Sequence, residues 1–252
     1  MSLLSLRPKE VQDNLTSLMK EKGITCINIP IVEAEGILNL KELGEVLKDD
    51  YDYFLFTSQI GALELKKIDS CMLNLLKDKV KKGKAISIGP ETLRALKSLG
   101  IDAELITKRY NTKALGIKLA SLGVKGKKIL LFRSKEAKDT LERFLEGKGA
   151  KTKTLRTHRL IASKKVSEAC ELALRDEIKG LIFTSPFIVR VFAENFRLKN
   201  SSLTELSRKG KKIFSIGPAT SKALRSYGLK EIYEAKESSS KGLLKLLHFY
   251  KF

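Results

Sequence analysis

The sequence has few of the residues that cross-link a chain or bind a transition metal. Among its 252 residues there are three cysteines and two histidines. Cys26, Cys71 and Cys170 are far apart in sequence, odd in number and form no Cys-x-x-Cys pair. This pattern argues against a disulfide framework or a zinc site and fits a reduced compartment. We therefore predict that the protein holds no metal.

Long apolar runs and nucleotide-binding loops are also missing. No stretch approaches the roughly 18 apolar residues of a membrane-spanning helix. The apolar run from Met1 to Arg7 is short and lacks the basic start and longer apolar core of a signal peptide. We therefore expect a cytoplasmic protein that binds no membrane, and a secreted solute receptor is disfavoured. The sequence has no glycine-rich dinucleotide fingerprint and no P-loop, and the glycines at 147 and 149 close a helix.

The charge balance is strongly basic, with 49 Lys and Arg against 29 Asp and Glu and a net charge of +20. Three interpretations are open: a solvated lysine-rich surface, an anionic ligand steered to its site, or nucleic acid. The basic residues are spread along the chain, mostly before predicted strands, which favours the first interpretation and then the second. Nucleic acid comes third, because aromatic residues do not cluster between basic ones.

Two short turns carry the clearest pattern in the sequence. One apolar run ends at Phe183–Pro186, and another ends at Ser215–Pro218. An amphipathic segment follows each, so each predicts a buried strand, a tight turn and a helix start. Ser185 is placed as the N-cap and Pro186 as the first helical residue. Because helix N-termini present free backbone N–H groups, two such turns side by side predict a binding site for an anion such as a carboxylate.

The same elements occur earlier in the chain. Three pairs of segments match in the same order, with offsets of 127, 128 and 126 residues: Phe56–Gln59 with Phe183–Pro186, Ser87–Thr92 with Ser215–Thr220, and Arg7–Glu10 with Arg133–Glu136. A period of this length is too long for a solenoid repeat. We interpret the chain as an internal duplication of a small domain.

Strands and helices are expected to alternate along the whole chain. Strands are predicted at 3–6, 25–29, 53–56, 85–88, 104–106, 128–132, 152–156, 181–183, 213–216 and 231–233. Helices are predicted at 10–22, 38–47, 68–79, 90–99, 113–122, 135–146, 166–174, 187–195, 218–227 and 241–250, the last capped by Ser240. The segments 30–36 and 158–162 are expected to cross between domains. Alternation of this kind predicts parallel α/β sheets, with ligands at the carboxyl ends of the strands.

Taken together, these motifs resemble the uroporphyrinogen-III synthase family over nearly the whole chain. The resemblance rests on Arg7-Pro8 after the first strand, the Phe-Thr-Ser turns at Ser58 and Ser185, Leu-Phe-Arg at 131–133, the Ile-Gly-Pro-x-Thr turns at Gly89 and Gly217, and the helix ends at Gly100 and Gly228. It implies two similar flavodoxin-like parallel-sheet domains joined by a two-stranded linker. Residues 1–33 and 163–252 would form the first domain, 37–157 the second, and 34–36 with 158–162 the linkers.

The resemblance also implies an activity: a lyase of haem and porphyrin biosynthesis that needs no cofactor. The reaction cyclises hydroxymethylbilane, a linear tetrapyrrole, with loss of water and inversion of ring D through a spiro intermediate, and yields uroporphyrinogen III in a cleft between the domains. Each pyrrole carries an acetate and a propionate, so the substrate is a polyanion that backbone N–H groups can hold. We expect a monomer that binds no nucleic acid, and a transient contact with the preceding enzyme of the pathway stays open.

Carrying the family motifs over residue by residue gives a set of candidate site residues. The expected substrate-binding residues are Arg7, Ser58, Gln59, Gly89, Arg133, Ser185, Pro186, Phe187, Gly217, Pro218, Ala219 and Thr220. The catalytic candidates are His158 and Thr220, whose hydroxyl is expected to face the cleft. His158 stands where the family usually has a tyrosine thought to assist the leaving hydroxyl. Gln59 stands where a proline is usual, so the first-copy turn is expected to be less regular.

Simpler roles stand beside these functional ones. Ser58 and Ser185 could act only as helix caps, and Arg7 and Arg133 could pair with acids on the following helices, although Arg7 is the preferred carboxylate partner. His158 could be a linker residue without a role. Three tyrosines could contact pyrroles or pack in the core: Tyr110, Tyr227 and Tyr233. The alternative function is a non-catalytic two-domain α/β binding protein for an anionic ligand or nucleic acid, which includes a duplicate that kept the fold and lost activity.

Overall fold

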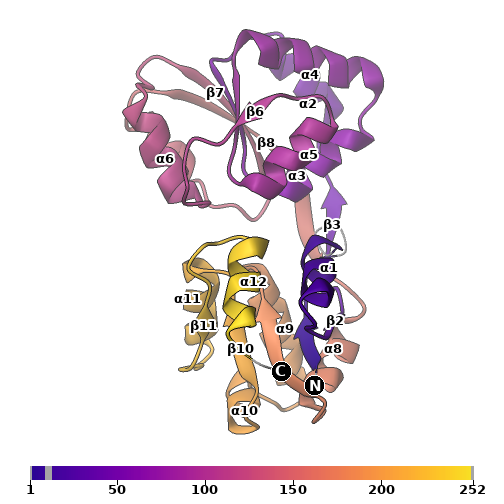
Figure 1. Ribbon diagram of the computed structural model, residues 1–252. Helices are drawn as coiled ribbons and strands as arrows, with labels where there is room; N and C mark the ends of the chain where they lie inside the picture. The colour runs from indigo at the N-terminus through magenta and orange to yellow at the C-terminus, as the bar shows by residue number, and fades with distance from the viewer. Residues whose placement is uncertain (1, 9–12, 251–252) are drawn as a thin grey trace. The chain divides into compact units, whose positions relative to one another are not determined.

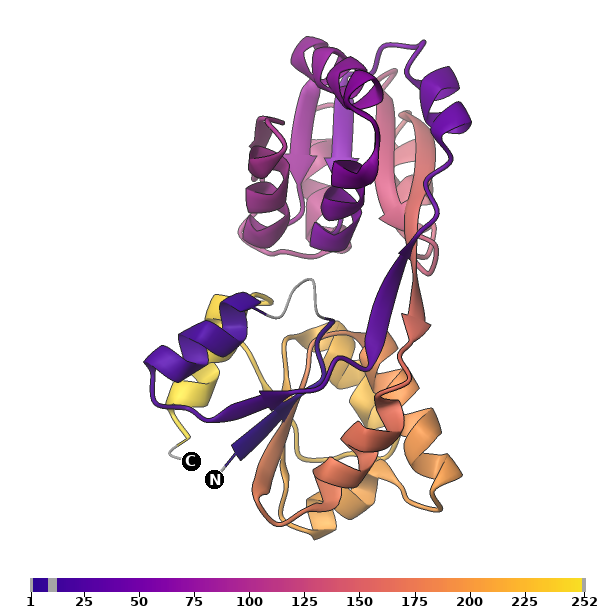
Figure 2. The same ribbon diagram turned by 90° about the vertical axis from the view of Figure 1, so that its right-hand side faces the viewer.

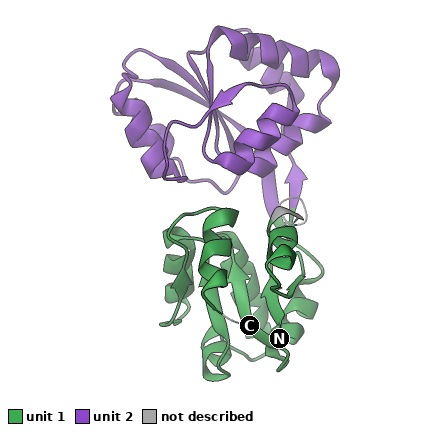
Figure 3. Ribbon diagram, in the orientation of Figure 1, with its two compact units in different colours: residues 1–33, 161–252 green, residues 34–160 purple. Residues whose placement is uncertain are grey.

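The computed structural model describes residues 2–8 and 13–250 (Figure 1). The chain forms two compact units (Figure 3). Unit 1 consists of residues 1–33 and 161–252, and unit 2 consists of residues 34–160. The sequence placed the corresponding boundaries at residues 33 and 163 and at residues 37 and 157.

Unit 1 is a five-stranded parallel sheet in the order β2-β1-β9-β10-β11. Its strands are β1 Ser2–Ser5, β2 Cys26–Asn28, β9 Ile178–Phe183, β10 Lys212–Ser215 and β11 Tyr233–Glu234. Its helices are α1 Asp13–Glu21, α8 Val166–Leu174, α9 Pro186–Leu198, α10 Leu203–Arg208, α11 Pro218–Ser226 and α12 Ser240–His248. In chain order this is 2-1-3-4-5, the order of flavodoxin-like sheets.

Helices cover both faces of the unit 1 sheet. Helices α1 and α12 pack together on one face, and α8, α9 and α11 lie on the other (Figure 2). Beneath α1 and α12, the fully buried side chains of Leu3 and Phe214 on the sheet meet Leu15 of α1 and Leu243 of α12. The amphipathic helices thus bury their apolar stripes on a sheet that is apolar on both faces, as a parallel sheet requires.

Unit 2 carries a six-stranded sheet in the order β3-β8-β7-β4-β5-β6. Its strands are β3 Val32–Gly36, β4 Tyr53–Phe56, β5 Lys84–Ser87, β6 Ala103–Glu104, β7 Lys128–Ser134 and β8 Lys151–Ala162. Its helices are α2 Leu40–Val46, α3 Gln59–Glu64, η2 Leu65–Lys67, α4 Ser70–Lys82, α5 Pro90–Ser98, α6 Thr112–Ser121 and α7 Thr140–Glu146. Strands β8 to β6 are parallel, and their order matches that of β2 to β11 in unit 1 position for position.

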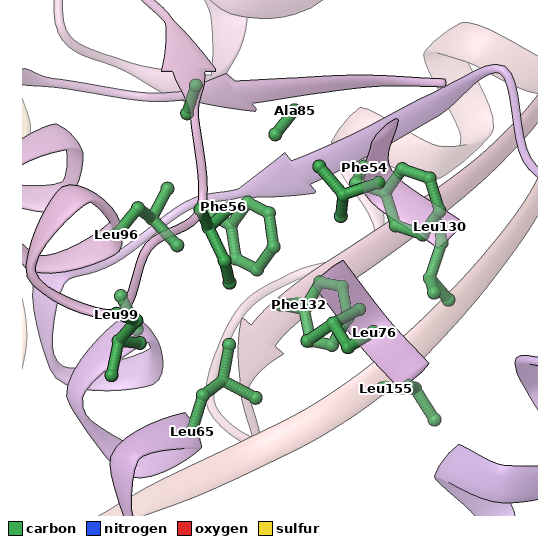
Figure 4. Close-up of a cluster of buried hydrophobic side chains, with 14 of the residues drawn as sticks. Phe54, Phe56, Leu65, Leu76, Ala85, Leu96, Leu99, Leu130, Phe132 and Leu155 are labelled. Atoms are coloured by element: carbon green, nitrogen blue, oxygen red, sulfur yellow. The ribbon is translucent and has the colours of Figure 1, made fainter. Parts of the chain in front are cut away.

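An aromatic cluster fills one side of the unit 2 sheet (Figure 4). The rings of Phe56 on β4 and Phe132 on β7 stack with their centroids 4.6 Å apart, and both side chains are buried. Leu65 and Leu76 pack over them from η2 and α4. The cluster fixes the ends of β4 and β7, which is where the predicted turns begin.

Strands β3 and β8 are the segments along which the chain passes from one unit to the other. Ile37 N donates to Thr157 O, and Ser163 N donates to Ile31 O, so the two strands run antiparallel. The sequence predicted a strand at 152–156 and a separate crossing segment at 158–162. The structure instead has one continuous strand, Lys151–Ala162, so the interruption was wrong.

Two helix predictions need correction, and two helices were missed. The helix predicted at 135–146 begins only at Thr140, because arginine side chains take the carbonyls that the missing turn would use: Arg156 binds those of Ser134 and Ala137, and Arg133 binds that of Lys138. Helices α3 and α10 were not predicted. The last helix is capped by Ser239, not Ser240. In the helix predicted at 10–22, positions 10–12 lie outside the described residues.

Across the described ranges, no helix is long and apolar enough to cross a membrane.

Candidate functional site

The turns that follow β4 and β9 begin with a serine that caps a helix. Ser185 has extended backbone angles, and its Oγ accepts from Ile188 N at 3.2 Å at the start of α9. Ser58 does the same for α3, accepting from Gly61 N at 2.8 Å. The predicted capping roles are confirmed. Pro186 is the first residue of α9 and is exposed. The two capped helices differ in length, with 13 residues in α9 and 6 in α3.

Replacing Ser185 with alanine is expected to lower the free energy of unfolding by about 1 kcal/mol, because Ile188 N loses its acceptor at the helix start. Ser185→Asn, which restores an acceptor, is the matched control and should recover most of the loss. Urea denaturation followed by circular dichroism measures both variants. Equal stability of Ser185→Ala and wild type would contradict the capping role.

The turns that follow β5 and β10 are built alike around a serine and a glycine. Ser215 Oγ accepts from Gly217 N at 3.2 Å and donates to Gly217 O at 2.9 Å. In the other unit, Ser87 Oγ accepts from Gly89 N at 3.2 Å and donates to Gly89 O at 2.6 Å. Each hydroxyl thus fixes the residue before a helix, and the helix then starts with an exposed or half-exposed proline.

Space, and not backbone strain, explains the glycine in the unit 1 turn. Gly217 is in the extended region, with φ 167° and ψ −178°, which any residue can adopt. A Cβ at Gly217 would lie 2.2 Å from Ser238 Oγ and 3.2 Å from Ser238 Cβ. A Cβ at Gly89 would meet its nearest neighbour, Tyr110 Cβ, at 3.4 Å. The unit 1 turn is therefore closed more tightly than its counterpart.

The side chains expected to act beside these glycines differ in exposure. Pro218 and Ala219 are exposed, so they leave the first turn of α11 open to solvent. Thr220 is only 2 % exposed, so its side chain is buried in the first turn of α11, and its predicted position facing the cleft stays a prediction. Arg7 is also buried, and its Nη1 donates to Ser240 Oγ at 3.0 Å, so it binds the first residue of α12.

An aromatic ring and a cation lie near the start of α9. The Phe187 ring is half-buried, and the guanidinium carbon of exposed Arg190 lies 4.7 Å from its centroid. A cation held over an aromatic face keeps its charge available at the helix N-terminus. Arg190 therefore adds positive potential near the Ser185 turn.

Arg133 pairs with an acid on the following helix, which is the simpler of its two predicted roles. Its side chain is 3 % exposed and forms a salt bridge with the carboxylate of Glu142, which is itself buried. Arg133 Nη1 also donates to Lys138 O at 3.1 Å, and Thr154 Oγ1 donates to Glu142 Oε1 at 3.0 Å. The charge of Arg133 is therefore compensated inside unit 2. Its predicted contact with a substrate carboxylate stays a prediction.

His158 lies inside unit 2 and not in a loop. It is 1 % exposed in β8, and its Nδ1 lies 2.9 Å from Thr157 Oγ1. Helix α3 approaches closely, since a Cβ at Gly61 would lie 2.9 Å from Thr157 Oγ1 and 3.5 Å from His158 Cε1. Burial lowers the pKa of His158, and the nearby charges of Glu136 and Glu64 only partly oppose this. The imidazole is therefore neutral at pH 7.

The buried histidine predicts a pH-dependent stability. A proton binds His158 more readily in the unfolded chain, so the free energy of unfolding should fall as pH drops below about 6.5 towards the lower pKa of the folded protein. His158→Gln should flatten this dependence between pH 7 and 5, and His248→Gln is the matched control. Urea midpoints measured across that range test the expectation. An unchanged slope in His158→Gln would contradict it.

The described histidines, cysteines and acidic residues do not gather into a set of metal ligands. In residues 2–8 and 13–250 no group of three or more His, Cys, Asp or Glu could hold a metal ion. The cysteines there are unpaired, and burial raises the pKa of Cys26 to about 12 and that of Cys170 to about 11. These thiols are therefore protonated and unreactive at neutral pH.

Comparison with known proteins identifies the family. Residues 13–245 match the sequence profile described as uroporphyrinogen-III synthase HemD. The chain belongs to the uroporphyrinogen-III synthase family. Members of this family are lyases of haem biosynthesis that act on a tetrapyrrole.

Individual relatives agree with the family assignment. The chain is 26 % identical over 258 residues to a putative uroporphyrinogen-III synthase of Methanocaldococcus jannaschii, covering 100 % of this chain and 99 % of that protein. A putative uroporphyrinogen-III synthase of Methanothermobacter thermautotrophicus is 26 % identical over 229 residues, 88 % of each chain.

Solved structures of the family share the fold. A mutant uroporphyrinogen III synthase of Thermus thermophilus superposes with a TM-score of 0.62 at 19 % identity, covering 99 % of this chain and 96 % of that one. The Helicobacter pylori uroporphyrinogen-III synthetase gives a TM-score of 0.63 at 18 % identity, with 97 % of both chains covered. The two-domain α/β fold with parallel sheets is thereby confirmed.

The sequence analysis missed Ser238, which closes the Gly217 turn. A signal was available, because the offset of 128 residues that relates Gly89 to Gly217 also relates Tyr110 to Ser238. The two residues that cover the glycine turns are therefore related by the same offset as the glycines themselves. Tyr110 was considered as a pyrrole contact without this link.

Proposed function

We propose that this chain is a uroporphyrinogen-III synthase that cyclises hydroxymethylbilane to uroporphyrinogen III, with loss of water and inversion of ring D. The observation that carries the proposal is the family match over residues 13–245 together with three helices that begin at glycine or serine turns. Helices α5, α9 and α11 start where β5, β9 and β10 end. Such helix starts supply backbone N–H groups for the carboxylates of a polyanionic tetrapyrrole.

The substrate contacts are proposed at the exposed and half-buried parts of these turns. In unit 1 they involve Ser185, Pro186 and Phe187 at the start of α9, and Pro218 and Ala219 at the start of α11. Arg190 over the Phe187 ring adds a cation there. Catalysis would then rest on positioning, because holding the chain folded brings the attacking ring carbon to the methylene. A site between the two units remains a prediction.

Internal duplication supports a proposal that both units take part. The matching strand order of the sheets and the equivalent turns at Ser58 and Ser185, and at Gly89 and Gly217, are what duplication of one domain would produce. We infer that Ser58 and Gln59 also contact substrate in unit 2, and that the buried Gly89 contributes by fixing the turn before half-exposed Pro90. Because α3 has only six residues, its N-terminus is the weakest of these contacts.

We propose that any chemical role of His158 is carried out by its neutral imidazole. With its pKa lowered by burial, it cannot serve as a cationic acid at pH 7. Its hydrogen bond to Thr157 Oγ1 holds one ring nitrogen inside the unit, which leaves Nε2 as the atom able to act. His158→Phe removes that atom and keeps an aromatic ring, so a loss of activity without loss of fold would support a chemical role.

The decisive experiment incubates the pure protein with freshly prepared hydroxymethylbilane and resolves the porphyrin isomers after oxidation. The expected result is an excess of the type III isomer over the type I product that forms spontaneously. Only type I from folded protein would overturn the enzyme proposal. The chain would then be a binding protein for an anionic ligand, which is the alternative left open by the sequence.

A further inference from the structure

Tyr110 covers the glycine turn of unit 2. It lies in the segment between β6 and α6, one residue before Asn111, the N-cap of α6. A Cβ at Gly89 would lie 3.4 Å from Tyr110 Cβ, 3.6 Å from Cγ and 3.8 Å from Cδ1, so one edge of the tyrosine rests on the turn. The side chain is therefore held at the end of β5, where helix α5 begins.

Packing does not account for this tyrosine. Tyr110 is half-buried and lies outside the buried clusters of unit 2, whereas Tyr233 packs against the core of unit 1. In the part of the chain that the structure describes, the Tyr110 hydroxyl has no hydrogen-bond partner. A half-exposed ring with a free hydroxyl, fixed by its neighbour at a helix start, is suited to contact a ligand ring.

A basic hollow lies along the same segment, and its lining includes Arg109 and Asn111, the residues on either side of Tyr110 in the sequence. It has a volume of about 400 Å³, and three cations line it: Arg109, Lys113 and Lys118. Thr107 and Asn111 line it too, and none of its lining residues is acidic. Among the described residues, none of the three cations has a carboxylate within salt-bridge distance, although thirteen such bridges occur elsewhere in them. The positive charge of this hollow is uncompensated.

The equivalent position of unit 1 shows what the aromatic ring adds. Ser238 covers Gly217 there, and its small hydroxyl lies within 2.2 Å of the space that a Cβ would take. The two copies therefore present different groups at matching turns: a hydroxyl in unit 1 and an aromatic ring flanked by cations in unit 2. A tetrapyrrole with unequal ring positions needs such a difference, because two identical surfaces could not tell one end from the other.

We propose that Tyr110 and the hollow lined by Arg109, Lys113 and Lys118 form a subsite for one carboxylated pyrrole of the substrate. The pyrrole ring contacts the tyrosine ring, and an acetate or propionate enters the basic hollow. This inference rests on the proposed function for the identity of the ligand. It adds a specificity-determining residue and a carboxylate site that the family motifs do not contain.

The test is binding of uroporphyrin III, the oxidised form of the product, measured by quenching of protein fluorescence. The chain has no tryptophan and six tyrosines, so tyrosine emission reports the titration. Tyr110→Ala is expected to weaken binding about fivefold to tenfold, and Tyr110→Phe less than twofold, because the ring and not the hydroxyl makes the contact. Absorption of the porphyrin Soret band gives the same constants for the variants that lose a tyrosine.

Charge variants test the hollow separately. Arg109→Gln and Lys113→Gln are each expected to weaken binding about threefold to tenfold at low salt and to reduce its salt dependence. Arg208→Gln removes a charge from exposed helix α10 of unit 1 and is the matched control. Tyr53→Ala controls for loss of a half-buried tyrosine elsewhere in unit 2, at the first residue of β4. Both controls should bind like wild type.

Two outcomes overturn the subsite, and they are distinct from failure of the proposed function. If wild type binds uroporphyrin III and Tyr110→Ala binds it equally well, the tyrosine contact is wrong. If wild type does not bind the porphyrin at all, the subsite is wrong whatever the isomer assay shows. If Tyr110→Ala loses affinity while wild type makes only type I product, the subsite stands and the synthase proposal falls.

Discussion

Arg133→Met is expected to lower the free energy of unfolding by about 3–5 kcal/mol, because it leaves the carboxylate of Glu142 buried without its partner. Glu142 is 6 % exposed, and the Thr154 hydroxyl is its remaining neutral donor. The double variant Arg133→Met/Glu142→Gln should recover most of the loss, since the amide oxygen still accepts from Thr154 and no charge is left inside. Urea denaturation followed by circular dichroism measures both.

A surface arginine on the same helix provides the control. Arg143 is exposed on α7, so Arg143→Met should change the free energy of unfolding by less than about 0.5 kcal/mol.

The double variant also decides between the two roles predicted for Arg133. Isomer formation close to that of wild type is expected. A large loss of activity in a folded double variant would show that Arg133 binds a carboxylate after all.

Gly217→Ala is expected to reduce kcat/KM for hydroxymethylbilane roughly tenfold. Rotation of Ser238 can move its Oγ away from the new methyl group, but Ser238 Cβ stays 3.2 Å from it. The turn must then shift by a few tenths of an ångström. Displacing groups that position a substrate lowers the reaction rate, by about 100-fold for a full ångström. Steady-state rates of type III formation measure the effect.

Ser238 and the Gly89 turn of unit 2 supply controls for this variant. In Gly217→Ala/Ser238→Gly the obstructing atoms are gone, so activity should return towards that of Ser238→Gly. Gly89→Ala, where the nearest atom is Tyr110 Cβ at 3.4 Å, should have a smaller effect. If the double variant is as impaired as Gly217→Ala alone, contact with Ser238 is not the reason for glycine at this position.

Local patterns were enough to predict the strands and turns around the candidate site. Ser185 and Ser58 could be recognised as caps because an apolar run, a hydroxyl and a helical stripe follow one another in the sequence. The extent of β8 could not be recognised in this way. Strand β7 pairs with it only as far as His158. Beyond that residue it pairs with β3, which lies more than a hundred residues away in the sequence.

Side-chain roles depended on contacts that sequence order does not contain. The pairing of Arg133 with Glu142 was one of two open roles, and the structure shows that this buried pair forms. Thr220 looked like a contact residue because it stands in the first turn of a helix, but its direction around that helix buries it. Ser238 was missed because it reaches Gly217 from a different loop.

The discontinuity of unit 1 has a consequence for the order of events during synthesis. Strand β1 sits in the centre of its sheet between β2 and β9, and β9 is not complete until residue 183 has been made. All of unit 2 has been synthesised by then. Residues 1–33 therefore cannot complete their sheet while the ribosome synthesises unit 2. During that time β9 does not yet cover the apolar side chains of Leu3 and Leu4. A nascent chain of this protein thus depends on keeping its first strand from pairing wrongly for most of its translation.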